Sequence, residues 1–191
     1  VLWDSQEQII VSNSSAAIMR ALDAVTSPAV EIDFSLRPEN LSREIEALNA
    51  LIYDGLANGV YRAGFAETQE SYDHAVDEVF ATLDLLEQRL ASSRYLLGTI
   101  ITEADWRLFP TLVRFDSAYY GAFKCNLRRL MDYPNLWPYT RELFQIPGVG
   151  ETVHPQIYKA GYYSKSAERN PSGIVPKGPI IDFTEAHGRG A

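Results

Sequence analysis

The sequence is poor in the residues that build disulfides, metal sites and membrane spans. It contains one cysteine, Cys125, and three histidines. One thiol cannot form a disulfide within the chain, so the sequence fits a reducing compartment and we expect a cytoplasmic protein. The histidines lie far apart, with no cysteine or carboxylate at metal-ligand spacing, so no metal site is expected. No apolar run approaches the roughly 18 residues that a membrane-spanning helix needs.

Basic residues are fewer than acidic ones, and the glycines do not cluster. The formal net charge is −8, from 17 basic and 25 acidic residues. Nucleic acids and anionic membranes both bind basic faces, so neither is expected as a partner. The glycines are scattered and form no phosphate-binding loop. What is present, 46% hydrophobic and 22% charged residues, is typical of a globular domain.

Residues 1–25 predict two short strands and a helix. The segments VLWD (1–4) and IIVS (9–12), separated by a polar turn, are typical of a hairpin. A helix is expected over 13–25, with Asn13 or Ser14 as its N-cap. Two strands and one helix cannot bury a core alone. We therefore interpret this segment as the C-terminal remnant of a larger domain.

The rest of the chain predicts a linker, a helical domain and a tail. Residues 26–41 carry two prolines and no helical period, and residues 165–191 are rich in proline and glycine, so an extended tail is expected there. Between them, helices are expected over 42–61, from 71 to about 91, from Thr102, over part of 134–150 and after Glu151.

Two of these helices carry strong local signals. The helix from residue 71 has an apolar stripe that suits antiparallel packing in a bundle, formed by Tyr72, Val76, Val79, Phe80, Leu83, Leu86 and Leu90. Thr102 and Asp105 form a T-x-x-D start close to a capping box. The helix that they begin is expected to continue through Leu108, Leu112, Phe115 and Tyr119 on one face.

Tyrosine and cysteine side chains are the candidate reactive groups. Tyr61 is expected just after a helix, before Gly64, which would end that helix in a left-handed conformation. Tyr162 lies near the end of the helical part. A tyrosine hydroxyl can donate to a developing phenolate or thiolate, although most tyrosines are simply packed rings. Cys125 lacks a nearby histidine or helix N-terminus to lower its pKa, so a buried structural thiol is favoured over a nucleophile.

Several long segments resemble one family in order and spacing. They are IYDGLANGVYRAGFAETQESYDHAV, RYLLGTIITEADWRLFPTLVRFD, FKCN and NPSGIVPKGP. Over almost the whole chain they resemble the xi class of glutathione transferases, the glutathionyl-hydroquinone reductases. The resemblance implies a mainly α fold, in which the β-β-α end of a thioredoxin-like domain (1–25) precedes an all-helical glutathione-transferase C-terminal domain (42–164).

The resemblance also implies an activity. A cysteine of the thioredoxin-like domain, in a C-P-W-type motif that is absent from this chain, attacks the sulfur of a glutathionyl-hydroquinone, and glutathione releases the mixed disulfide. Tyr61 matches the tyrosine of the family's NGVY-K/R-AGFA motif, and Tyr162 matches the one before N-P-x-G-I. Both are implied to hydrogen-bond the hydroquinone oxygens. A homodimer is implied, and this chain alone is expected to be inactive.

One departure from the family concerns the thiol. The resemblance implies contacts from Leu2, Ser14 and Ser15, but the family usually reads N-E-S-S where this chain has Asn13-Ser14-Ser15-Ala16. Ser14 supplies no counter-charge for the γ-glutamyl ammonium, so glutathione or another small thiol, such as mycothiol, is left open. Two other hypotheses stay open as well: a non-catalytic binding or interaction protein on the same helical domain, and a helical domain whose tyrosines only pack.

Overall fold

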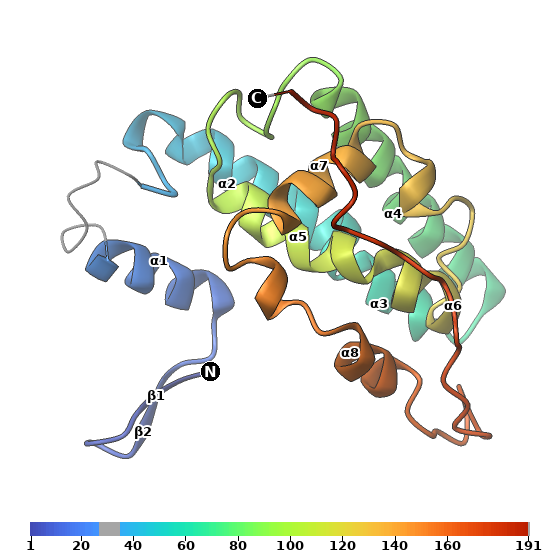
Figure 1. Cartoon of the computed structure of the whole chain (residues 1–191). Coiled ribbons are helices and arrows are strands. Elements are labelled where there is room, and N and C mark those ends of the chain that lie inside the picture. Colours follow the sequence, from blue (N-terminus) through green and yellow to red (C-terminus); the bar gives the residue numbers. More distant parts are fainter. Residues whose placement is uncertain (27–34, 191) are drawn as a thin grey trace. The chain divides into compact units, whose positions relative to one another are not determined.

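The chain forms two compact units, Val1–Asn40 and Leu41–Ala191 (Figure 1). The computed structural model describes residues 1–26 and 35–190. Half of the predicted linker, residues 27–34 of 26–41, therefore lies outside the described residues. Its described end contains a 3-10 turn, Glu39–Leu41. No helix in the described ranges combines the length and the apolar character needed to cross a membrane.

The N-terminal unit contains the predicted hairpin and helix. Strand β1 (Leu2–Asp4) pairs antiparallel with β2 (Ile9–Ser12), with Trp3 opposite Ile10 and Asp4 opposite Ile9. Helix α1 spans Ser15–Thr26, and the Ser14 hydroxyl accepts the Ala17 N–H at 3.2 Å. Both predictions are thus confirmed, with Ser14 as the cap.

The C-terminal unit is a helical bundle. Its elements are α2 (Ser42–Leu51), the π-helical η2 (Ile52–Ala57), α3 (Gly59–Gly64), α4 (Gln69–Leu90), α5 (Glu103–Arg114), the π-helical η3 (Phe115–Tyr119), α6 (Tyr120–Ala122), the 3-10 turn η4 (Leu130–Asp132), α7 (Leu136–Phe144), the 3-10 turn η5 (Gly150–Thr152) and α8 (Pro155–Tyr162). The predicted fold class, a mainly helical bundle after a short hairpin and helix, is confirmed.

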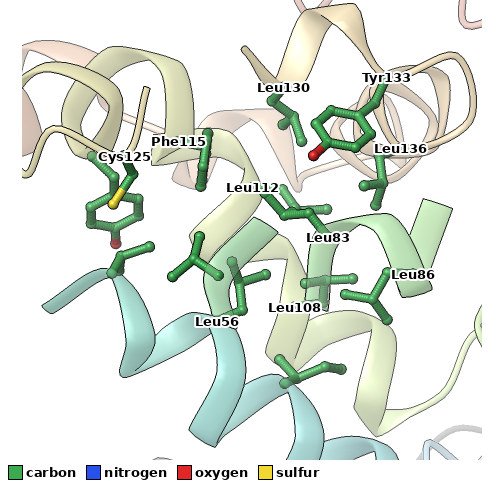
Figure 2. Close-up of a cluster of buried hydrophobic side chains, with 14 of the residues drawn as sticks. Leu56, Leu83, Leu86, Leu108, Leu112, Phe115, Cys125, Leu130, Tyr133 and Leu136 are labelled. Carbon is green, nitrogen blue, oxygen red and sulfur yellow. The ribbon is translucent and has the colours of Figure 1, made fainter. Parts of the chain in front are cut away.

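The core of the bundle lies between α4, α5 and the elements that flank them. The predicted stripe of α4 is buried from Val76 to Leu90, with Tyr72 partly buried at its edge. Leu83 and Leu86 of α4 meet Leu108 and Leu112 of α5 and Leu56 of η2 (Figure 2). Each such leucine contributes roughly 1.5–3 kcal/mol of transfer free energy on burial.

The segment predicted as one helix over 42–61 is helical but is not a single α-helix. A π-helical segment, η2, separates α2 from α3, and the second helix runs on to Gly64. Tyr61 therefore lies inside α3 rather than after a helix. Close packing against α4 explains the glycine in this segment, because a Cβ on Gly55 would lie 2.1 Å from the Thr82 hydroxyl. The π-helical turn adds a residue to the helix and shifts the face that its successors present.

The start of α5 confirms the predicted T-x-x-D cap. One Asp105 carboxylate oxygen accepts the Thr102 N–H at 2.8 Å and the Thr102 hydroxyl at 2.9 Å. The other accepts the Leu96 N–H at 3.0 Å and the Tyr139 hydroxyl at 2.8 Å. A buried carboxylate with four donors joins α5, the loop before it and α7. The predicted continuation of this helix changes to the π-helical η3 at Phe115.

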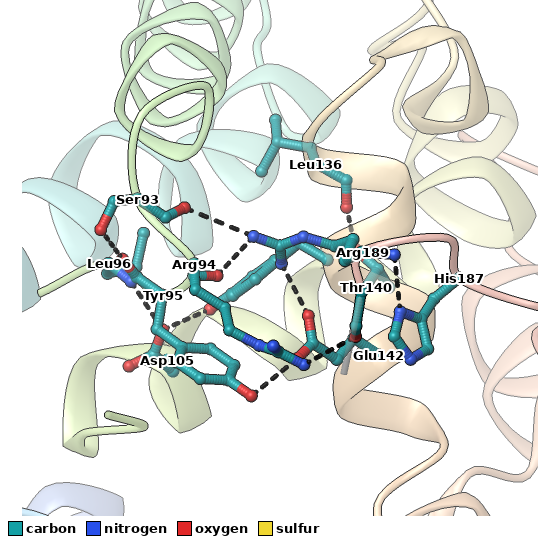
Figure 3. Close-up of polar contacts among 12 residues, drawn as sticks. Ser93, Arg94, Tyr95, Leu96, Asp105, Leu136, Thr140, Glu142, His187 and Arg189 are labelled. Atoms are coloured by element: carbon teal, nitrogen blue, oxygen red, sulfur yellow. Dashed lines mark hydrogen bonds and ion pairs between the residues drawn. The ribbon is translucent and has the colours of Figure 1, made fainter. Parts of the chain in front are cut away.

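The C-terminal tail has no helix or strand between residues 171 and 190, as expected, but it is docked on the bundle. Phe183 is 7% exposed, with its ring centroid 5.3 Å from that of Trp137 and 5.1 Å from that of Phe144. Further on, Arg189 pairs with Glu142 of α7 at 3.0 Å, and Glu142 also accepts from Arg94 at 2.8 Å (Figure 3). The composition of the tail predicted its irregular backbone and not these contacts.

Candidate functional site

Tyr61 and Tyr162 are brought together although 101 residues separate them in the sequence. Tyr61 lies in α3 and Tyr162 is the last residue of α8. Their hydroxyl oxygens are 2.6 Å apart, a short hydrogen bond in which either group can donate. Tyr61 is 37% exposed, so the pair is accessible from solvent.

A third tyrosine, Tyr119, completes the cluster. Its hydroxyl oxygen lies 3.0 Å from that of Tyr162, and its side chain is only 3% exposed. The sequence placed Tyr119 on an apolar stripe, which accounts for its buried ring but not for its hydroxyl. No pattern in the sequence marked this hydroxyl; in the structure, Tyr119 lies in the π-helical η3, a type of distortion that is frequent at functional sites.

Phenylalanine rings surround these hydroxyls. Phe123 has its ring centroid 5.2 Å from Tyr61, 5.6 Å from Tyr119 and 5.5 Å from Tyr162. Phe65 stacks on Tyr61 at 6.4 Å with an interplanar angle of 8°. The three hydroxyls therefore form a polar spot in an aromatic wall, an arrangement that suits a flat ring carrying oxygen atoms.

Gly64 makes room for this wall. It is part of α3 and does not have the left-handed conformation that we expected of it. A Cβ at this position would lie 2.3 Å from the Phe123 ring. Space for Phe123, rather than the end of a helix, is the reason that this position needs glycine.

The hydroxyls of Tyr61 and Tyr119 stay protonated at neutral pH. Burial first and the hydrogen bond to Tyr162 second raise the pKa of Tyr61 to about 12, against smaller opposing effects of Tyr119 and Arg114. Burial, followed by the hydrogen bond to Tyr162, also raises the pKa of Tyr119. Both groups are consequently available as hydrogen-bond donors.

Cys125 is not suited to nucleophilic attack. Its side chain is fully buried, and burial raises the pKa of its thiol to about 12. The thiolate is the reactive form, and almost none is present at neutral pH. The predicted buried thiol is confirmed. Across residues 1–26 and 35–190, no group of three or more His, Cys, Asp or Glu side chains could hold a metal ion.

The other predicted site residues lie in the N-terminal unit. Leu2 begins β1, and Ser15 begins α1. The Ser14 hydroxyl is engaged as the helix cap, and the Ser14 N–H donates to the Ser12 hydroxyl at 3.1 Å. The exposed N-terminus of α1 offers the positive end of a helix dipole to a carboxylate.

Comparisons with known proteins agree on one family. The model of the glutathione S-transferase C-terminal domain matches residues 69–142. A glutathionyl-hydroquinone reductase of Escherichia coli is 46% identical over 193 residues, an alignment that covers 99% of this chain and 58% of that protein. The chain thus spans less than two thirds of the length of this relative.

Solved structures give the same result. The glutathione-bound structure of a glutathione transferase homologue from Escherichia coli matches with a TM-score of 0.95 and 45% identity, covering 99% of this chain and 61% of that one. A xi-class glutathione transferase from Natrialba magadii matches with a TM-score of 0.93 and 42% identity, covering 98% of this chain and 58% of that one.

Proposed function

Because this chain belongs to the xi class of glutathione transferases, the class of the glutathionyl-hydroquinone reductases, we propose that it carries the hydroquinone-binding part of a thiol-dependent reductase. The proposed reaction converts the thioether adduct of a thiol and a hydroquinone, plus a second thiol, into the free hydroquinone and a disulfide. The observation that carries the proposal is the pair of hydroxyls of Tyr61 and Tyr162, 2.6 Å apart in an aromatic wall.

The tyrosines act as hydrogen-bond donors to the ring oxygens. When the bond between sulfur and the ring carbon breaks, electron density moves onto the ring and its oxygen atoms. Hydroxyls fixed in advance next to those oxygens stabilise this charge without reorganisation, and each such donor is typically worth on the order of 10²–10³ in kcat. The raised pKa of Tyr61 keeps its proton in place for this role.

The covalent steps are two thiol exchanges. A thiolate attacks the adduct sulfur, so that an S–S bond forms and the aryl C–S bond breaks, and the ring carbon takes up a proton. The second thiol then attacks the mixed disulfide and releases the first thiolate. Cys125 does not supply this thiolate, because its thiol is buried and protonated. The nucleophile is proposed to be the cysteine of a thioredoxin-like domain, and this chain alone is proposed to be inactive.

The proposed cosubstrate is glutathione, the ligand bound in the homologous structure from Escherichia coli. Leu2, Ser14 and Ser15 are its proposed contacts, with the carboxylate at the N-terminus of α1. Ser14 brings no negative charge toward the ammonium group, and this favours a different small thiol, such as mycothiol, as the second candidate. The whole protein is proposed to be a cytoplasmic homodimer.

The test is a reductase assay on the protein as its gene encodes it. Glutathionyl-hydroquinone and a thiol are supplied, and hydroquinone is quantified by chromatography. Tyr61→Phe and Tyr162→Phe should each slow its release at least about tenfold. The control, Tyr53→Phe, changes an exposed tyrosine of η2 outside the cluster and should leave the rate unchanged. Full rates in both cluster variants would remove the proposed roles.

A non-catalytic binding protein is the alternative, favoured by the burial of Cys125, the one cysteine of this chain. The same assay separates the two. If the encoded protein binds hydroquinone through Tyr61 and Tyr162 but releases none from the adduct, the alternative is correct.

A further inference from the structure

A pocket of about 370 Å³ opens beside the tyrosine cluster. It shares Tyr162 and Phe123 with the cluster, and its other lining residues include Lys124, Tyr163, Arg169 and Ile174. Tyr162, whose hydroxyl lies next to those of Tyr61 and Tyr119, therefore also faces this pocket. The pocket is large enough for a substituent on a bound ring.

The backbone around this pocket is built tightly. A Cβ on Gly121 would lie 2.1 Å from the Tyr163 hydroxyl, so glycine lets Tyr163 form part of the lining. Lys124 has a left-handed backbone, with φ at 59°, and its carbonyl accepts the Tyr72 hydroxyl at 2.6 Å. The backbone conformation and this hydrogen bond fix the direction in which the Lys124 side chain points from the backbone.

Two cations of the pocket, Arg169 and Lys124, have no carboxylate partner among residues 1–26 and 35–190. The Arg169 guanidinium lies 4.2 Å from the centroid of the Phe65 ring, which in turn stacks on Tyr61. In the described part of the chain, neither Arg169 nor Lys124 forms an ion pair, whereas the exposed Arg62, Arg128 and Arg129 all do. Glu168 also lines the pocket, so the local charge is one positive unit in a chain of net charge −8.

We propose that this pocket binds an anionic substituent, a carboxylate or a sulfonate, on the aromatic ring of the substrate. The ring lies against Phe123 and Tyr162, and the anion is bound by Arg169, with Lys124 as a second positive charge. A guanidinium suits this role because its planar fork matches a carboxylate or sulfonate, and its stacking on Phe65 limits its freedom before the ligand arrives.

The inference rests on the proposed function for the position of the ring and goes beyond it in naming a substrate class. Charge-assisted hydrogen bonds at a partly exposed site should favour the anionic ligand on the order of tenfold over the neutral one. The preference should decrease as ionic strength rises, because both cations are exposed.

The experiment is calorimetric titration of this chain with two probes, hydroquinone and its carboxylated form, gentisate. Gentisate should bind about tenfold more tightly. Arg169→Gln and Lys124→Gln should each reduce or abolish that difference. Lys165→Gln makes the same charge change on an exposed lysine outside the pocket lining and should keep the full difference.

The outcomes separate this inference from the proposed function. Equal affinity for the two probes, or a preference that survives both substitutions, overturns the anion subsite and leaves the hydroquinone site standing. If hydroquinone itself fails to bind, the hydroquinone site is overturned and the subsite with it.

Discussion

The two units of this chain contain similar apolar residues but bury them very differently. In the N-terminal unit, Trp3 is 50% exposed and Ile10 is 54% exposed, and no described residue up to Asn40 is fully buried. In the C-terminal unit, Leu108 and its neighbours are completely buried. Two strands and a helix have too few surfaces to enclose a side chain, whereas the bundle surrounds α5 with several elements.

The same contrast applies to the candidate chemistry. The tyrosine cluster lies on the packed unit, where Gly64 and Phe123 fix the rings. The proposed thiol contacts Leu2, Ser14 and Ser15 lie on the unit without a core. All eleven tyrosines of the sequence also lie beyond residue 40, so tyrosine signals report on the C-terminal unit alone.

The largest expected effect is the loss of a core leucine. Leu108→Ala should lower the free energy of unfolding by about 2–5 kcal/mol, because it removes buried methyl groups and leaves a cavity. Ile10→Ala in β2 should change it by no more than about 0.5 kcal/mol. Urea denaturation followed by tryptophan fluorescence measures both, because Trp3 lies in the N-terminal unit and Trp106 and Trp137 lie in the C-terminal unit. Equal losses would contradict the contrast in burial between the units.

Two aspartates, one in each unit, test the same difference in burial for polar side chains. Asp105→Ala removes the acceptor for the Leu96 N–H, the Tyr139 hydroxyl and the donors of Thr102, and should cost about 2–3 kcal/mol. Asp4 also accepts two backbone N–H groups, from Gln6 and Glu7, but in an exposed turn. Asp4→Ala should cost well under about 1 kcal/mol in the same denaturation experiment.

Matched helix caps should give similar local costs in the two units. Ser14→Ala at α1 and Thr68→Ala at α4 each remove a hydroxyl that accepts a backbone N–H, worth about 1 kcal/mol. The loss at Thr68 should appear in global unfolding. The loss at Ser14 should appear only as faster amide hydrogen exchange in α1. A global effect of Ser14→Ala would show that the units unfold together.

The smallest effect concerns alkaline pH. The pKa of Tyr61 is raised in the folded state, from about 10 to about 12, so its contribution to stability is complete below pH 10 and is lost as pH rises toward 12. Tyr61→Phe should flatten this decline by under about 1 kcal/mol, because the side chain is partly exposed. Denaturation midpoints at pH 8 and pH 11 test it, with Tyr53→Phe as the control that keeps the decline.

Local patterns predicted the fold well and the site only in part. The stripe of α4 and the Thr102–Asp105 cap depend on neighbours three to seven residues away, so a sequence displays them directly. The need for glycine at position 55 in η2 comes from its close approach to Thr82 of another helix. The hydroxyl partner of Tyr119 is 43 residues distant. Contacts between residues so far apart in the sequence can be seen only in the tertiary structure. The resemblance to the family indicated Tyr61 and Tyr162, because they lie in its motifs, but not Tyr119.

The docked tail has a consequence for the order of folding. Arg189 donates to the Ser93 carbonyl, a residue 96 positions earlier, so this contact closes one of the longest loops in the chain. Closing a loop of that length before α5 and α7 are in place would cost entropy that nothing yet offsets. We therefore expect the segment around Arg189 to attach last during folding of the C-terminal unit and to detach first when that unit opens, so that within this unit it should be cleaved early under limited proteolysis.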